Sequence, residues 1–269
     1  MFKILEKYSL APQIHYCLVE APLIARKAKS GQFVIVRVRE QGERIPLTIA
    51  DFDRDKGTIT LVFQSLGKTT YLFSQMKAGD SLLDLLGPQG NPTEIENFGH
   101  TVVIGGGIGI APVYPLARSL KKAGNKVTAI IGFRGKEYVF WEDEMRSVSD
   151  ELLIATNDGS YGKKGFVTDV IKELMNSGER IDKVFAIGPA IMMKAVSDMT
   201  KPNNIPTVVS LNSLMVCGMG MCGACRVSIG GKTKFTCMDG PDFDAHQVNF
   251  EELMKRLDTY KQEEVSSKD

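Results

Sequence analysis

Four of the five cysteines lie close together near the C-terminal end of the chain. Cys217, Cys222, Cys225 and Cys237 fall within 21 residues, whereas Cys17 stands alone. Disulfide-stabilised proteins spread their cysteines through a small secreted chain, and the first ten residues here lack the apolar run of a secretion signal. The cluster therefore predicts a metal site.

The spacing of these cysteines favours an iron–sulfur cluster. The first three follow the C-x4-C-x2-C pattern of plant-type 2Fe-2S ferredoxins, and Cys237 supplies a fourth thiolate later in the chain. Three glycines between Cys217 and Cys225 let the loop wrap closely around a cluster, because glycine accepts positive φ. Structural zinc and four reduced thiols stay open as alternatives, although zinc ribbons prefer paired C-x2-C units and only one is present.

A glycine-rich turn offers a second kind of chemistry. Residues 105–112 read GGGIGIAP, follow a short apolar segment and open a helical stretch. Free backbone N–H groups and the helix dipole favour an anion here, such as a nucleotide phosphate. Pro112 departs from the dinucleotide fingerprint, but the first helical turn tolerates its missing N–H.

Three later loops follow predicted strands and hold further candidates. Arg134 ends the strand after the glycine turn and would meet a ribose or phosphate, or else be a surface charge. Asp158 lies in the loop at 156–160, and Gly188-Pro189 follows another strand. Ordinary turn chemistry explains these residues equally well, but ligands of open α/β sheets bind at this edge.

The first hundred residues carry β-strand patterns. Alternating apolar segments at 31–39, 57–63 and 81–86 are separated by turns, and the last is expected to stop at Gly87-Pro88. One helix is expected near residues 70–76. Short strands at such intervals predict a small antiparallel β-barrel.

Beyond residue 100, strand patterns alternate with helical ones. Strands are expected at 101–104, 126–131, 151–155 and 183–187, with a helix at 166–177 between the last two. This alternation predicts a doubly wound α/β unit with a parallel sheet, whose ligand site lies past the carboxyl ends of the strands.

The chain is expected to divide into three domains. They are a barrel at 1–98, an α/β unit at 99–205 and a cluster-binding unit at 206–269. The last unit should end in an amphipathic helix. One face of that helix would carry Phe250, Leu253, Met254, Leu257 and Tyr260.

Composition excludes two classes of function. Among 269 residues, Lys+Arg 33 against Asp+Glu 32 leaves a net charge of +1, so there is no basic excess to neutralise nucleic-acid phosphates. The longest apolar stretch, at 101–113, is short and interrupted by glycines, and cannot span a bilayer. We therefore expect a soluble, cytoplasmic protein without membrane insertion.

Together these motifs resemble the ferredoxin-NADP reductase superfamily of flavoproteins over the whole chain. The segment RIPLT, residues 44–48, is similar to the segment that holds FAD in that family. The resemblance implies that Arg44 pairs with the FAD pyrophosphate and that Thr48 faces flavin N5 as the catalytic residue. Pro46 and Leu47 complete the segment, with Pro46 in place of the stacking tyrosine of plant-type reductases.

The same resemblance implies the remaining ligands and names the domains. The barrel becomes FAD-binding, the α/β unit NAD-binding and the third unit 2Fe-2S-binding. The implied FAD contacts are Gly67, Thr69, Thr70 and Gly87. The implied nicotinamide-nucleotide contacts are Gly107, Gly109, Pro112, Gly188 and Pro189, and Arg134 and Asp158 are added as cofactor candidates for their position at the strand ends. The implied iron ligands are Cys217, Cys222, Cys225 and Cys237.

Two branches of the superfamily are similar to this chain. Pro46 is typical of the electron-transfer subunits of type B dihydroorotate dehydrogenases. The helix after Cys237 is typical of the small (alpha) subunits of NADH-dependent reduced ferredoxin:NADP oxidoreductase, also called sulfide dehydrogenase subunits. Several members of that second, bifurcating group carry aspartate where this chain has Cys217, so the choice of branch stays open.

The cofactors imply a function. A nicotinamide gives two electrons together as hydride, a 2Fe-2S cluster accepts one at a time, and a flavin exchanges electrons in both ways. The resemblance implies an NAD(P)H-linked oxidoreductase subunit that passes electrons, by way of FAD and 2Fe-2S, between NAD(H) and a larger iron–sulfur flavoprotein in a bifurcating ferredoxin:NADP oxidoreductase heterodimer. The alternatives are the dihydroorotate dehydrogenase subunit and, in another class, a zinc-stabilised nucleotide-binding regulator. The choice between NAD and NADP stays open.

Overall fold

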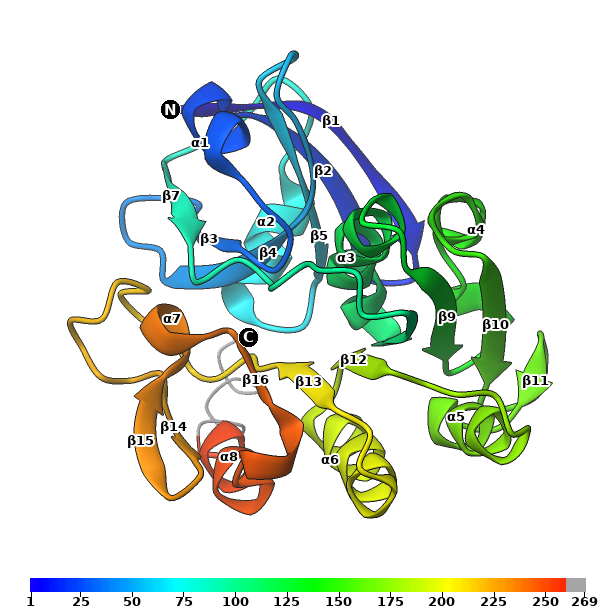
Figure 1. Cartoon of the computed structure of the whole chain (residues 1–269). Helices are drawn as coiled ribbons and strands as arrows, with labels where there is room; N and C mark the ends of the chain where they lie inside the picture. Colours follow the sequence, from blue (N-terminus) through cyan, green and yellow to red (C-terminus); the bar gives the residue numbers. More distant parts are fainter. Residues whose placement is uncertain (260–269) are drawn as a thin grey trace.

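The structure is a computed structural model that describes residues 1–259, so Tyr260 of the predicted helix face lies outside the described residues. The described chain forms two seven-stranded sheets and a two-stranded hairpin, arranged as three adjoining units (Figure 1). Within this part of the chain, no helix is long and apolar enough to cross a membrane.

The N-terminal unit is the predicted antiparallel barrel, which is nearly closed. Its strand order is β6-β1-β2-β5-β4-β3-β7. The strands are β1 (Phe2–Ala11), β2 (Ile14–Glu20), β3 (Phe33–Arg37), β4 (Arg44–Asp53), β5 (Thr58–Gln64), β6 (Ser81–Leu82) and β7 (Asp84–Gln89). Its helices are α1 (Pro22–Lys27) and α2 (Lys68–Gln75), and α2 lies close to the predicted position.

The strand predicted at 81–86 is wrong in two respects. The chain divides at Leu83 into β6, which pairs with β1, and β7, which pairs with β3. These pairings lie at opposite edges of the sheet, so the bend nearly closes the barrel. β7 also continues through Gly87-Pro88 instead of stopping there. Pro88 falls at an irregularity in the pairing of β7 with β3, a place where proline is tolerated in a sheet.

The second unit is the predicted doubly wound α/β unit. Its strand order is β11-β10-β9-β8-β12-β13-β16, parallel except for β16. The strands are β8 (His100–Gly106), β9 (Lys126–Phe133), β10 (Glu151–Thr156), β11 (Lys163–Lys164), β12 (Lys183–Ile187), β13 (Thr207–Ser210) and β16 (Asp242–Asp244). The helices are α3 (Ile110–Lys122), α4 (Glu142–Val148), α5 (Val167–Asn176) and α6 (Ala190–Thr200). Apolar residues of α3 and α4 cover one face of the sheet, and those of α5 and α6 cover the other.

The third unit is small and grows out of the second sheet. It holds the hairpin of β14 (Arg226–Ile229) and β15 (Lys232–Phe235), followed by α7 (Thr236–Asp239) and α8 (Phe250–Leu257). Asn249 caps α8 by accepting a hydrogen bond from the Glu252 N–H at 3.1 Å. Both β13 and β16 belong to the second sheet, so the chain beyond residue 205 is continuous with the α/β unit. The domain boundary expected at 205/206 therefore stays a prediction.

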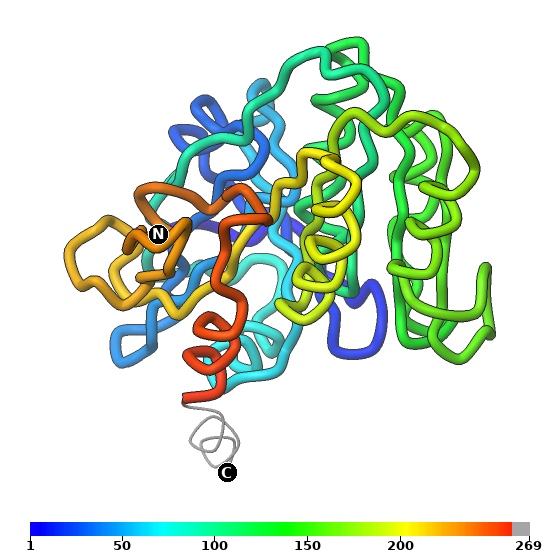
Figure 2. The backbone as a smooth tube through the Cα atoms, turned by 60° about the horizontal axis from the view of Figure 1, so that its bottom comes forward, coloured from blue at the N-terminus to red at the C-terminus, as the bar shows by residue number. Residues whose placement is uncertain are grey.

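The barrel and the α/β unit share one hydrophobic core. Ile14, Ala50 and Val62 on the outside of the barrel pack in one cluster with apolar residues of α3, including Ile110 and Val113. The tube in Figure 2 shows the C-terminal segment, in orange, lying against the barrel strands in blue. All three units therefore meet around the middle of the molecule.

Candidate functional site

A cavity of about 310 Å³ lies where the three units meet. The barrel contributes one wall, the glycine turn and the end of β12 contribute a second, and the segment after β13 contributes a third. The lining residues are Phe33, Ile45, Pro46, Leu47, Thr48, Val62, Phe63, Gln64, Leu66, Thr70, Ile108, Gly109, Pro112, Ile187, Gly188, Ser210, Leu211, Asn212, Met215 and Pro241. Its walls are mostly apolar with a few polar groups, as ligand sites require.

The cavity brings together about half of the cofactor contacts expected from the sequence. From the barrel come Pro46, Leu47, Thr48 and Thr70, and from the nucleotide unit come Gly109, Pro112 and Gly188. The segment at 44–48 is the first half of β4, paired with β3. A strand holds these side chains more rigidly than a loop, with Thr48 directly opposite Phe33.

The other expected FAD contacts do not line this cavity. Arg44 points to Asp84, with 3.6 Å between Nη2 and Oδ2. Thr69 is buried and donates to Glu43 Oε2 at 2.9 Å. Gly67 precedes α2 with open space beside it, and Gly87 lies in β7. Their roles toward FAD remain predictions, and Arg44 would have to leave Asp84 to reach a phosphate.

The glycine turn has one open and one crowded position. Gly107 has φ +55° with open space around its Cα, so its backbone is accessible to a ligand. At Gly109 a Cβ would lie 2.1 Å from the carbonyl oxygen of Ile187, so only glycine lets the turn pass β12. The turn and Gly188 therefore meet between β8 and β12, where the strand order reverses and ligands bind in such sheets.

Arg134 and Asp158 come together at the ends of β9 and β10, outside the cavity. The Asp158 N–H donates to the Arg134 carbonyl at 3.4 Å, and the Asp158 carboxylate accepts bonds from both N–H and Oγ of Ser160. Those bonds hold the pKa of Asp158 below its ordinary value. Pro189 occupies the N-cap position of α6, directly after Gly188. The contacts of these three residues with a nucleotide remain predictions.

The four clustered cysteines form two pairs in different surroundings. Cys225 and Cys237 are 3% and 2% exposed, and their Sγ atoms are 3.2 Å apart. Cys222 is exposed and Cys217 partly so, and the Cys222 N–H points at Cys217 Sγ from 3.4 Å. We call Cys225 and Cys237 the inner pair, and Cys217 and Cys222 the outer pair. Cys17, by contrast, is a buried core residue of β2.

The pairs also differ in the pKa of their thiols. Burial raises the pKa of Cys237 to about 12, and the neighbouring Cys225 adds to that effect. Burial also acts upward on Cys217, but N–H groups of Met219 and Cys222 outweigh it and lower its pKa to about 7. A positively charged metal core would stabilise thiolates at the inner pair.

This donor set fits a two-iron cluster better than a single ion. One zinc ion at about 2.3 Å from each sulfur would draw all four thiolates together. Within residues 1–259, no group of three or more His, Cys, Asp or Glu side chains is arranged to hold one metal ion. Two pairs of thiols, with loop N–H groups directed at sulfur, suit an iron pair with two thiolates on each iron.

Phe33 is a site residue that the sequence analysis missed. It lines the cavity, and it also packs with Ile35 against Cys225 and Cys237 in a small cluster that includes Met215. A signal was present, since pairing the predicted strand at 31–39 with residues 44–48 sets Phe33 opposite Thr48. The cavity and the inner pair therefore share a wall.

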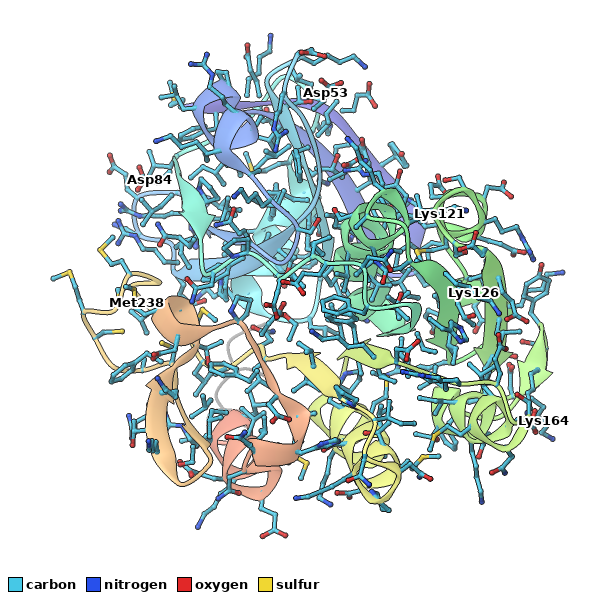
Figure 3. All side chains as sticks on the ribbon, in the orientation of Figure 1. Asp53, Asp84, Lys121, Lys126, Lys164 and Met238 are labelled. Carbon is cyan, nitrogen blue, oxygen red and sulfur yellow. The ribbon has the colours of Figure 1, made fainter. Side chains whose placement is uncertain are left out.

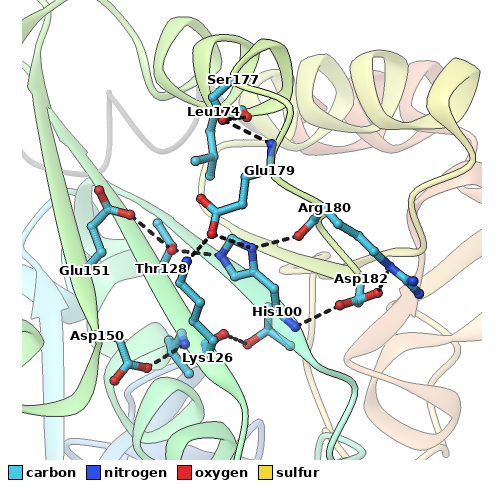
Figure 4. A network of polar contacts seen from close by, with 12 residues as sticks. His100, Lys126, Thr128, Asp150, Glu151, Leu174, Ser177, Glu179, Arg180 and Asp182 are labelled. Carbon is cyan, nitrogen blue, oxygen red and sulfur yellow. Dashed lines mark hydrogen bonds and ion pairs between the residues drawn. The ribbon is translucent and has the colours of Figure 1, made fainter.

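The histidines lie elsewhere. His100 bridges the Arg180 carbonyl and Thr128 Oγ1, each at 2.9 Å, at the far end of the second sheet (Figure 4). His15 contacts Ser65 on the barrel, and His246 contacts Thr200. A larger hollow of about 620 Å³ beside β10 and α5 is lined by none of the expected site residues.

Comparison with known proteins identifies both C-terminal units. Residues 103–198 match the oxidoreductase NAD-binding domain, and residues 212–249 match the iron–sulfur cluster binding domain of dihydroorotate dehydrogenase B. A Thermotoga maritima protein described as a dihydroorotate dehydrogenase B (NAD(+)) electron transfer subunit homolog is 45% identical, covering 98% of this chain and 93% of its own. The electron transfer subunit of that enzyme from Desulforamulus reducens is 37% identical over 93% of this chain and 97% of its own.

Two solved structures are also similar to this chain. A structure of the NADH-dependent reduced ferredoxin-NADP oxidoreductase, reported for flavin-based electron bifurcation, has a chain with TM-score 0.94 and 44% identity, covering 99% of this chain and 96% of its own. A Neisseria gonorrhoeae ferredoxin NADP+ reductase with bound FAD and NADP has TM-score 0.63 at 18% identity over 76% of this chain and 90% of its own, and so shares the fold. This chain belongs to the family of NAD-linked oxidoreductase electron transfer subunits that includes those of dihydroorotate dehydrogenase B.

Proposed function

We propose that this chain is the FAD- and 2Fe-2S-containing electron-transfer subunit of an electron-bifurcating ferredoxin:NADP oxidoreductase. It would exchange electrons between NAD(H) and a larger iron–sulfur flavoprotein. The solved relative reported for bifurcation is 44% identical, compared with 33% to 38% for the subunits named as those of dihydroorotate dehydrogenase itself, from Desulforamulus, Geobacillus and Fusobacterium. The Thermotoga protein, at 45%, is described as a homolog of such a subunit. That difference favours the bifurcating complex.

The observation that carries the proposal is the wall formed by Phe33. One side chain contacts both the cavity where the flavin motif meets the glycine turn and the buried inner pair. FAD bound here would supply chemistry in both two-electron steps, with a nicotinamide, and one-electron steps, with a cluster. Thr48 would donate its hydroxyl hydrogen near flavin N5, Arg44 would neutralise the pyrophosphate, and the glycine turn would hold the nicotinamide nucleotide at the start of α3.

The surface around the outer pair fits a partner subunit. Val216, Met219, Met221 and Met238 are all exposed there, at 42% to 81%. Figure 3 shows Met238 and neighbouring sulfur atoms at this edge, away from the nucleotide unit. Exposed apolar groups gathered in one place mark interaction sites, and methionine packs adaptably against a partner. We place the heterodimer contact here and the complex in the cytoplasm.

The second candidate is the electron-transfer subunit of an NAD-linked dihydroorotate dehydrogenase, favoured by the domain match at 212–249. The two candidates differ in the partner. Purification of the native complex without air, followed by mass spectrometry, flavin and iron analysis, decides between them. We expect a larger iron–sulfur flavoprotein. An FMN-containing α/β-barrel partner would favour the dihydroorotate enzyme, and a colourless zinc protein would favour the regulator.

The same complex also tests whether the subunit uses NAD(H) or NADP(H). The match to an NAD-binding domain and the carboxylate of Asp158, which Ser160 holds at the end of β10, favour NAD(H) over NADP(H), because a carboxylate accepts a bond from a ribose hydroxyl and repels a 2′-phosphate. Rates with NADH and NADPH and an artificial acceptor test this choice. Faster reduction by NADPH would contradict it.

A further inference from the structure

Two elements that form the cavity, β4 and α3, are joined again at their far ends. The first half of β4 supplies Pro46 to Thr48, and the first turn of α3 supplies Pro112. Further along both elements, Arg118 Nη2 donates to Asp51 Oδ1 at 2.5 Å. Building on the proposed function, we propose that Asp51 and Arg118 are positioning residues. Their contact sets how the glycine turn approaches Thr48.

The ion pair lies outside the cavity that it would control. Asp51 is three residues beyond Thr48, about 10 Å along a strand. Arg118 is six residues beyond Pro112, about 9 Å along a helix. Neither residue lines the cavity. The pair therefore acts on the site only through the relative placement of β4 and α3.

The pair is itself held in one arrangement. The Arg118 guanidinium lies 5.3 Å from the centre of the Tyr114 ring and 5.8 Å from that of Phe52. The Phe52 N–H donates to the same Asp51 oxygen at 2.8 Å. Flat aromatic faces and a second donor fix the direction of the charged contact.

A second polar contact supports the same junction. Ser30, before β3, donates its hydroxyl to the Pro115 carbonyl at 2.9 Å and meets Ser119 Oγ at 2.7 Å. Between these contacts, α3 touches the barrel through apolar residues such as Ala50 and Val113. Apolar contact is non-directional and tolerates small sliding, so the polar contacts determine the register of the helix on the barrel.

A positioning role differs from a stabilising role in its consequences. Arg118 and Asp51 are 37% and 31% exposed, and ion pairs that exposed contribute little to the free energy of unfolding. Hydride transfer, in contrast, depends steeply on alignment, and a misplacement of about 1 Å can slow a reaction about 100-fold. Breaking the pair should therefore slow flavin reduction and leave the melting temperature nearly unchanged.

The test uses the purified complex. Stopped-flow absorbance follows the reduction, by NADH, of the FAD bound to this chain. In Arg118→Met we expect the limiting rate of flavin reduction to fall about 10-fold, while the dissociation constant for NADH changes less than about 2-fold. Arg118→Lys should retain most of the rate. Lys194→Met is the matched control, because it breaks the exposed pair of Lys194 with Asp198 on α6 and should leave the rate unchanged.

A charge swap and hydrogen exchange complete the test. Asp51→Arg and Arg118→Asp should each slow reduction, and the double variant should recover at least part of the loss. In Arg118→Met, amide exchange in 49–53 and 110–118 should accelerate, which does not depend on turnover. Unchanged reduction in Arg118→Met, or a swap no faster than the single variants, would overturn the inference. Failure of the unaltered complex to react with NADH would overturn the proposed function instead.

Discussion

The inner and outer cysteine pairs differ in burial, in their neighbours and in the pKa of their thiols. Cys225 and Cys237 are buried against barrel residues Phe33 and Ile35, whereas Cys222 is exposed on a glycine-rich loop. The inner pair adjoins the cavity, and the outer pair adjoins exposed methionines. The difference gives the cluster site two sides, one facing the flavin cavity and one facing outward.

The two sides are also fastened differently. On the inner side, Thr93 Oγ1 donates to Asp242 at 2.5 Å, and the Asn91 N–H donates to the Gly240 carbonyl at 2.7 Å, so the linker after the barrel is tied to the cluster unit. The exposed side of the loop carries Met221, which is 81% exposed. A rigid inner side fixes the path from the cavity, and an open outer side leaves room for a partner.

Removing one ligand from each pair has the largest expected effect. Cys222→Ser and Cys225→Ser should both lose the cluster, because a 2Fe-2S core needs four thiolates. Cys222→Ser should keep its FAD and its melting temperature. Cys225→Ser should also melt at a lower temperature, because the buried site is left with a polar hydroxyl. Iron analysis and thermal melting check this. Identical melting of the two variants would contradict the contrast between the pairs.

Substitution of Arg44 tests FAD binding separately from the iron–sulfur cluster. Arg44→Ala should weaken FAD binding about 10- to 100-fold, the loss expected for a charge-assisted hydrogen bond to phosphate, and leave iron content unchanged. Arg37→Ala is the matched control, because Arg37 also pairs with Asp84, at 3.2 Å. Flavin retention on gel filtration measures both variants. Equal retention in the two would count against the assignment of Arg44.

The outer side can be tested by placing a charge on it. Met221→Asp should weaken binding of the purified partner subunit about 10- to 100-fold, as for a central interface residue, with flavin and iron retained. Leu23→Asp is the control, since Leu23 is 73% exposed on α1 of the barrel. Calorimetric titration measures both. Unchanged affinity in Met221→Asp would place the interface elsewhere.

The smallest expected effect concerns Asp242 at the inner junction. Burial raises the pKa of its carboxyl above the ordinary value, although Thr93 and Ser210 act in the opposite direction. The folded protein then binds this proton more tightly than the unfolded chain does. Its contribution to stability is therefore present at low pH and is lost as pH rises through the raised folded-state pKa.

Asp242→Asn removes that titration and keeps an acceptor for Thr93. The free energy of unfolding, measured in urea between roughly pH 4 and pH 8, should fall less with rising pH in the variant than in the unaltered chain. Asp198→Asn, on an exposed face of α6, is the control and should not change the slope. The same slope in Asp242→Asn would contradict a raised pKa of this carboxyl.

The contrast between local and long-range contacts explains what could be predicted from the sequence. The α/β strands and the cysteine spacing depend on neighbouring residues, and the fold that they imply is confirmed. Which strand edges β6 and β7 join depends on closure of the barrel, so the single strand expected at 81–86 was wrong. Asn212 lines the cavity because three distant segments converge there. No local pattern records that convergence.

One titration tests whether electrons pass from the cavity to the inner side of the cluster. The chain with FAD and 2Fe-2S bound is titrated with NADH without air, while absorbance follows the flavin and electron paramagnetic resonance follows the iron pair. We predict that the flavin absorbance bleaches and that the resonance signal of the reduced cluster rises with it. A bleached flavin beside a cluster that only dithionite reduces would contradict it.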